Sequence, residues 1–71
     1  MGKIKFTLNG QSEETPIKTS IHSLVLKYKF NPNLIIVEYN QQILKQNQYN
    51  ETFIQPNDTV EIIRYIGGGK I

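Results

Sequence analysis

Residues 3–10, Lys-Ile-Lys-Phe-Thr-Leu-Asn-Gly, decide how the fold begins, because polar and apolar side chains alternate along them up to a turn dipeptide. Alternation with a period of two is typical of a strand with one buried face. Asn9-Gly10 readily takes the positive φ angles of a two-residue type I′ turn. The stretch therefore predicts a β-hairpin. We expect its return strand at residues 13–18, on a sheet edge, since Pro16 cannot donate a ladder hydrogen bond.

The chain after the hairpin changes from strand spacing to helix spacing. Four apolar side chains fall at positions i, i+3, i+4 and i+7, which places them on one helical face. They are Ile21, Leu24, Val25 and Tyr28. Ser20 is a suitable N-cap and Pro32 disfavours helical geometry before it, so we predict one helix of about ten residues between them. We expect the helix to pack against Ile4, Phe6, Val37 and Ile62.

Further strand and turn patterns complete the expected sheet. In chain order they are an apolar strand at 34–39, a turn at Asn40-Gln41, a short strand at Gln42–Leu44, a loop with one helical turn at 45–52, a turn at 55–58 and a last strand at 59–66. We expect the first and last strands to pair at the centre. The fold class predicted is α+β: a mixed four- to five-stranded sheet with one helix packed across one face, an arrangement that resembles the β-grasp, or ubiquitin-like, fold.

Composition excludes several classes of function. The chain has 71 residues, no cysteine, one histidine and a net charge of +2. The missing cysteines exclude disulfides, thiolate nucleophiles and cysteine-based metal sites. The charge bias is too weak to indicate nucleic-acid or membrane binding, and no apolar run has the ~20 residues that span a bilayer. Early alternation also argues against a signal peptide, so we expect a soluble, intracellular protein.

Conventional catalytic groups are poorly represented. His22 has no nucleophile and acid arranged around it in the sequence, so we expect a solvated helix residue. Glu13-Glu14 is expected to be a solvated edge. The lysines lack the aromatic or Arg residues that stack on bases, which indicates a solubilising surface. The sequence predicts neither a catalytic residue nor a metal ligand.

The one sharp feature is the glycine triplet after the last strand. Gly67, Gly68 and Gly69 are three of the five glycines in the chain. Glycine has no Cβ, so such a segment can enter channels that a side chain would block. We expect residues 1–66 to form the domain and residues 67–71 to form a flexible tail.

The chain resembles the ThiS group of sulfur-carrier proteins of thiamine biosynthesis over essentially its whole length. The matching residues are Asn9-Gly10, Ser20, Leu24, Val37-Glu38-Tyr39-Asn40, Pro56-Asn57-Asp58, Val60-Glu61-Ile62-Ile63 and Gly67-Gly68-Gly69. Two features depart from the family's pattern. Asn57 stands where the family has a turn glycine, a position that a left-handed Asn tolerates, and Lys70-Ile71 extends beyond the glycine end.

The resemblance implies a carrier and not an enzyme. Gly69 would be the sulfur-carrying residue, first adenylated and then converted to a thiocarboxylate, with Gly67 and Gly68 as the flexible arm. The implied partners are a ThiF-like adenylating enzyme, which uses ATP, the thiazole synthase ThiG, and a cysteine desulfurase as the indirect sulfur source. No bound cofactor, nucleic acid or membrane is expected.

Two alternatives stay open. A MoaD-like sulfur carrier for molybdopterin synthesis has the same fold and terminal chemistry, and a non-catalytic β-grasp interaction module would leave the glycines inert. We predict that Arg64 and Tyr65 contribute to docking on the activating enzyme. We also predict that Lys70-Ile71 must be removed before Gly69 can be activated. The expected location is the cytoplasm, or the plastid stroma if the gene is plastid-encoded.

Overall fold

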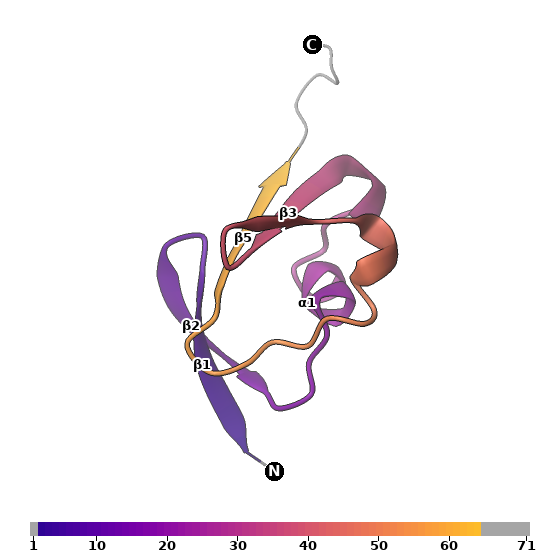
Figure 1. Ribbon diagram of the computed structural model, residues 1–71. Helices are drawn as coiled ribbons and strands as arrows, with labels where there is room; N and C mark the ends of the chain where they lie inside the picture. The colour runs from indigo at the N-terminus through magenta and orange to yellow at the C-terminus, as the bar shows by residue number, and fades with distance from the viewer. Residues whose placement is uncertain (1, 65–71) are drawn as a thin grey trace.

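The computed structural model describes residues 2–64 of the chain (Figure 1). Along these residues five strands, one α-helix and two 3-10 helices follow one another. They are β1 (Lys3–Leu8), β2 (Gln11–Pro16), α1 (Ile21–Lys27), η1 (Pro32–Leu34), β3 (Ile35–Tyr39), β4 (Gln42–Leu44), η2 (Gln46–Gln48) and β5 (Thr59–Arg64). The predicted loop at 45–52 does contain its helical turn, which is η2.

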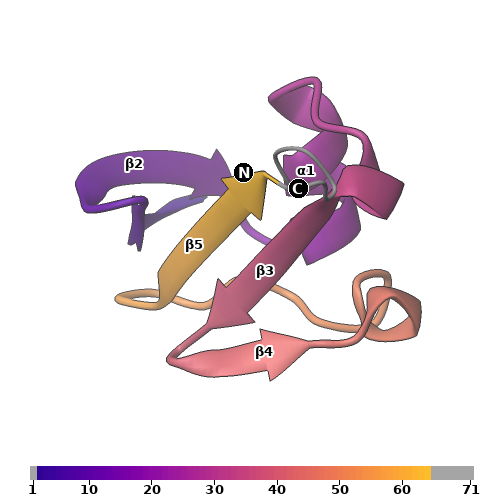
Figure 2. The ribbon, with the colours of Figure 1, turned by 90° about the horizontal axis from the view of Figure 1, so that it is seen from above.

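The strands form one mixed sheet in the order β2-β1-β5-β3-β4. The first and last strands lie parallel at its centre, and the other neighbours are antiparallel. Figure 2 shows β5 beside β3, with α1 set to one side of them. Along β5, buried Val60 and Ile62 alternate with exposed Thr59, Glu61 and Ile63, so the sheet has one covered and one open face. This arrangement confirms the predicted fold class.

The first hairpin forms where the sequence predicts it. Asn9 and Gly10 have φ angles of 50° and 83°, as a type I′ turn requires. The return strand, however, is β2 at Gln11–Pro16, so the predicted range of 13–18 was wrong. A two-residue turn makes pairing start at once, with Leu8 opposite Gln11, and Lys18 leaves the extended region at a φ angle of 68°. β2 lies at a sheet edge, as predicted.

The helix begins as predicted but ends early. Ser20 accepts a hydrogen bond from the Ser23 N–H at 3.0 Å and is the N-cap. The predicted length was wrong, because α1 has seven residues and stops well before Pro32. Lys29 takes a left-handed φ angle of 64°, and the amides of Lys29 and Phe30 donate back to the carbonyls of Leu26 and Val25. These two bonds form a Schellman motif, which closes the helix.

Tyr28 is therefore not a core residue. It is the C-cap of α1 and its side chain remains 39% exposed, so its predicted place on the buried face was wrong. Because the helix ends there, the i+7 position no longer continues the apolar stripe. Leu34 was also misplaced: it ends η1, is exposed, and precedes β3 instead of starting it.

The core lies between α1 and the covered face of the sheet. Ile21, Leu24 and Val25 of α1 are buried, as are Phe6, Val37 and Ile62 of the strands, while Ile4 is partly buried against them. Two further core residues, Tyr49 at 2% and Ile54 at 1% exposure, were not predicted from the sequence. Both belong to the long segment between β4 and β5, which folds back over the helix.

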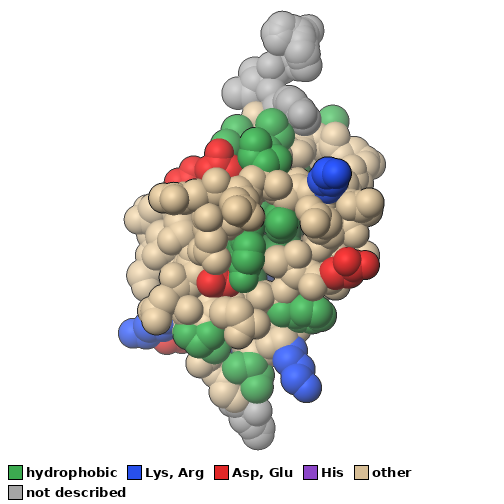
Figure 3. All heavy atoms as spheres, viewed as in Figure 1, with side chains coloured by type: hydrophobic (Ala, Val, Ile, Leu, Met, Phe, Trp, Pro, Cys, Tyr) green, Lys and Arg blue, Asp and Glu red, His purple; other side chains and the backbone are tan. Residues whose placement is uncertain are grey.

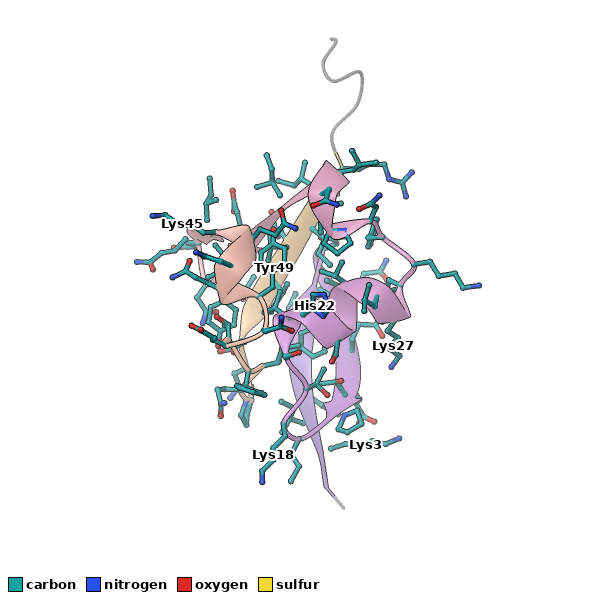
Figure 4. The ribbon with its side chains drawn as sticks, turned by 90° about the vertical axis from the view of Figure 1, so that its right-hand side faces the viewer. Lys3, Lys18, His22, Lys27, Lys45 and Tyr49 are labelled. Atoms are coloured by element: carbon teal, nitrogen blue, oxygen red, sulfur yellow. The ribbon has the colours of Figure 1, made fainter. Side chains whose placement is uncertain are left out.

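That segment also completes the helix N-terminus. The amides of Ile21 and His22 donate to the carbonyls of Thr52 and Tyr49 at 2.8 and 3.0 Å. The first amides of a helix have no partner within the helix, so these bonds prevent the free-energy cost of burying unpaired N–H groups. Figure 4 shows Tyr49 between η2 and α1. The segment is thus part of the folded core and not a free loop.

Candidate functional site

The residues that the sequence singles out most strongly lie beyond the described part of the chain. Tyr65, Gly67, Gly68 and Gly69 all follow Arg64, the last described residue. The structure does define the point from which they continue. β5 pairs with β1 on one side and with β3 on the other, and Figure 1 shows β5 ending at the end of the molecule opposite to the start of β1.

Side-chain hydrogen bonds fix β5 further. Asn9 of the hairpin turn accepts a hydrogen bond from the Ile62 amide through its Oδ1 atom at 2.8 Å, and its own amide donates to the Val60 carbonyl at 2.9 Å. Asn9 thus bonds to β5 where the β1–β5 ladder stops. The chain beyond Arg64 therefore starts from a rigid strand.

Arg64 lies on the helix side of the sheet. Its guanidinium carbon is 5.3 Å from the centre of the Phe30 ring, a cation–π contact of about 0.5–1 kcal/mol. Both side chains line a shallow hollow of about 240 Å³ together with Lys29 and Leu34. Arg64 is exposed, so it is accessible to a partner as well as to Phe30.

The open face of the sheet carries a second group of residues near the end of β5, three of them exposed and two, Ile36 and Glu38, half-buried. In the β3–β5 pairing Ile36 lies opposite Ile63 and Glu38 lies opposite Glu61, while Ile43 of β4 lies opposite Glu38. We call these five residues the open-face patch. Ile43 is 68% and Ile63 is 45% exposed. Figure 3 shows hydrophobic and acidic side chains next to one another near this end of the molecule.

Sequence reasoning did not identify the open-face patch. The alternation in β5 already indicates that Glu61 and Ile63 point away from Val60 and Ile62. It does not indicate which residues of β3 and β4 lie beside them, because that depends on the register between strands far apart in the sequence.

A hydrogen-bonded network occupies the covered side of the same strands. Asp58 is buried, and its carboxylate accepts bonds from the Tyr39 hydroxyl, the Gln55 amide at 2.7 Å and the Asn40 side-chain amide at 3.1 Å. Burial, and then the bond to Asp58 and its charge, raise the pKa of Tyr39 to about 12. The network joins the β3–β4 turn to the start of β5, which is a structural role.

The polar residues considered from the sequence do not assemble a catalytic site within residues 2–64. His22 lies on the first turn of α1, as expected, but it is half-buried and so less solvated than predicted. Glu13 is also half-buried. Burial first, and then the charge and hydrogen bond of Glu13, raise the pKa of Tyr28. In the same range no group of three acidic or histidine side chains could hold a metal ion.

The lysines are spread over the surface. Figure 4 shows Lys3, Lys18, Lys27 and Lys45 on different elements, pointing outward in different directions. Such a distribution fits a solubilising surface better than a nucleic-acid site, which gathers basic groups on one face. None of the helices in residues 2–64 has the length and hydropathy needed to cross a bilayer.

Comparison with known proteins places these features in a family. The sequence model of the ThiS family matches residues 6–69. The sulfur carrier protein ThiS of Bacillus subtilis is 32% identical over 63 residues, which cover 87% of this chain and 96% of that protein. The protein ycf40 of Trieres chinensis is 34% identical over 64 residues, covering 90% of this chain and 88% of the relative.

A longer relative and a solved structure also match this chain. A thiazole synthase of Magnetococcus marinus is 28% identical over 67 residues, which cover 94% of this chain but 21% of that protein. The crystal structure of the thiamine biosynthesis protein ThiS from Geobacter metallireducens superposes with a TM-score of 0.80 at 23% identity, covering 93% of this chain and 100% of that one. The chain belongs to the ThiS family.

Proposed function

We propose that this ThiS-family sulfur carrier of thiamine biosynthesis carries sulfur as a thiocarboxylate on the backbone of Gly69. The observation that carries the proposal is the extent of the family match, which ends at Gly69, the last of the three glycines. A sulfur atom on a backbone carboxyl needs no cysteine, and the chain has none. β5 supports the proposal by giving the glycine segment a fixed origin.

The chemistry assigned to this chain is that of a substrate. The carboxylate of Gly69 attacks the α-phosphorus of ATP and releases pyrophosphate, which leaves an acyl adenylate. A persulfide formed on a cysteine desulfurase then displaces AMP at the same carbonyl carbon, giving an acyl disulfide. A thiol such as excess cysteine reduces the S–S bond of this intermediate, which leaves the thiocarboxylate on Gly69 and the second sulfur in a disulfide. Adenylation makes the carbonyl electrophilic, and the partner enzymes supply the catalytic groups. The chain is accordingly a carrier and not an enzyme.

Two enzymes are proposed as direct partners. A ThiF-like adenylating enzyme activates Gly69, and the thiazole synthase ThiG accepts the sulfur. The second partnership is supported by the thiazole synthase that contains a stretch similar to nearly all of this chain. We place the protein in the cytoplasm or, where the gene is plastid-encoded, in the plastid stroma.

Residues Lys70 and Ile71 follow the proposed sulfur-carrying residue. Because Lys70 follows Gly69 directly, the Gly69 carboxyl is held in a peptide bond and cannot attack ATP. We therefore propose that a peptidase removes these two residues before activation.

An ATP–pyrophosphate exchange assay tests this function. The ThiF-like enzyme from the same genome is given either the full chain or a form that ends at Gly69. We expect exchange with the shorter form and none with the full chain. Equal exchange with both forms, with residues 70 and 71 still present by intact mass, would contradict the processing step. Absence of exchange with either form would contradict the carrier function.

A further inference from the structure

We propose that the open-face patch docks on a partner surface that places a Lys or Arg side chain against Glu38 and Glu61, surrounded by apolar groups. The inference rests on the proposed function, because the partner is taken to be the adenylating enzyme that acts on Gly69. It assigns the charge and the apolar character of the surface on that enzyme.

The two carboxylates of the patch lie on neighbouring strands. Glu38 and Glu61 are direct cross-strand partners, so their side chains leave the same face of the sheet from neighbouring strands. Like charges directly opposite each other destabilise a strand pair. The isolated domain therefore carries an unfavourable pair that a cation from outside would relieve.

The fold does not relieve this pair itself. Neither carboxylate has an ion-pair partner among residues 2–64. The other acidic residue on the open face differs, because Glu14 of β2 lies opposite Lys5 of β1. The same sheet face thus places a base opposite an acid near the beginning of β1, and an acid opposite an acid beside the end of β5.

Apolar side chains surround the acidic pair, and of these Ile43 and Ile63 are exposed while Ile36 is half-buried. Ile43 lies next to Glu38 on β4, and Ile36 and Ile63 form the next cross-strand pair toward the end of β5. Contiguous exposed apolar side chains rimmed by polar ones mark protein interaction sites. Charges beside such a centre set the orientation and the rate of association. A surface of this kind fits a folded protein.

Chain length limits how far Gly69 can lie from the patch. Gly69 is five positions after Arg64, and an extended chain spans at most ~3.6 Å per residue, so Gly69 stays within about 18 Å of Arg64. Ile63 is the neighbour of Arg64, so an enzyme of ordinary size that holds Gly69 lies close to the patch. Acidic side chains there repel phosphates, which disfavours a nucleic acid or an anionic membrane as the occupant.

The test compares charge-removing variants in the carrier form that ends at Gly69. Glu38→Gln and Glu61→Gln remove one charge each, and Glu14→Gln is the matched control on the same face. The readouts are the KM for the carrier and the kcat in ATP–pyrophosphate exchange with the ThiF-like enzyme, the dependence of KM on NaCl concentration, and the thermal midpoint of the free carrier.

We expect each patch variant to raise KM about fivefold with kcat unchanged, to weaken the salt dependence, and to raise the thermal midpoint because the repulsion is gone. Glu14→Gln should leave KM unchanged and should not raise the thermal midpoint. A purely structural role would not increase stability while weakening binding.

Other results separate the two proposals. Unchanged KM values with an active wild-type carrier would overturn the docking surface and leave the carrier function intact. Unchanged KM values together with a loss of self-association in sedimentation would identify a second copy of the chain as the occupant, which also overturns the proposal. No exchange with the wild-type carrier would overturn the carrier function and, with it, this assignment.

Discussion

Asp58 and Glu61 are three residues apart on the same stretch of chain, yet their carboxylates have opposite surroundings. Asp58 is buried and accepts hydrogen bonds from three groups, the Tyr39 hydroxyl, the Asn40 side chain and the Gln55 amide. Glu61 is exposed and lies opposite another glutamate. The Asp58 carboxylate is hydrogen-bonded within the fold, whereas the Glu61 carboxylate is available to a cationic group of a partner.

Residues such as Asp58 stabilise the domain, whereas residues such as Glu61 are available to bind a partner. Groups satisfied inside the fold contribute to stability, and their loss leaves buried donors unpaired. Exposed groups with unfavourable neighbours lower stability, and we attribute their presence to the binding of a partner. Changes in the Asp58 network should therefore affect unfolding, and changes near the end of β5 should affect association.

The largest stability effect is expected at Asp58. Asp58→Ala removes the acceptor of the Gln55 amide and of the Asn40 side chain and leaves the Tyr39 hydroxyl only its longer bond to the Phe53 carbonyl, which should lower the free energy of unfolding by about 2–3 kcal/mol. Urea denaturation followed by circular dichroism measures the change. The exposed Glu51→Ala is the control, with an expected change within about 0.5 kcal/mol. A similarly small effect for Asp58→Ala would contradict the structural role of the network.

A smaller effect should appear as a pH dependence. The pKa of Tyr39 is raised to about 12 from an ordinary value near 10, so the folded state favours the neutral phenol. Its contribution is present in full below pH 10 and is lost as the pH rises through 12. Because the side chain is only partly buried, we expect a loss of about 1 kcal/mol.

Tyr39→Phe provides the comparison for this pH dependence. The variant lacks the ionisable group, so its free energy of unfolding should fall less between pH 10 and 12 than that of the wild type. Denaturation at a series of pH values measures both curves. Parallel curves would show that Tyr39 does not contribute to the alkaline loss of stability.

The smallest effect concerns the predicted docking role of Arg64 and Tyr65. Arg64→Ala and Tyr65→Ala should each raise the KM for the carrier in ATP–pyrophosphate exchange about twofold, equivalent to about 0.4 kcal/mol. Lys3→Ala, at the opposite end of the molecule, is the control and should leave KM unchanged. If the first two variants also leave KM unchanged, Arg64 has only its contact with Phe30 and the predicted docking role is wrong.

Local patterns predicted much of the fold. The alternation at residues 3–8, the Asn9-Gly10 turn and the Ser20 N-cap depend on neighbouring residues, and all are present in the structure. The early end of α1 depends on Lys29 adopting a left-handed conformation, which its residue type does not favour. Asn57, at a φ angle of 70°, does follow the expectation for an Asn in place of a turn glycine.

The remaining features depend on contacts between distant residues. Tyr49 and Ile54 are buried because their segment folds back on α1, and no local period predicts that. Asp58 was recognised as a turn residue, but its bonds to Tyr39 and Asn40 join positions 19 and 18 residues away. The pairing of Glu38 with Glu61 likewise follows from strand register, which composition and alternation alone do not define.

Whether Gly69 carries the sulfur can be measured by intact-mass spectrometry. The form ending at Gly69 is incubated with ATP, the ThiF-like enzyme, a cysteine desulfurase and cysteine, and its C-terminal peptide is then sequenced by mass spectrometry. We expect a mass increase equal to the replacement of one oxygen by one sulfur, located on Gly69, and no increase without ATP. An unchanged mass in the presence of active enzymes, or a sulfur located on another residue, would contradict it.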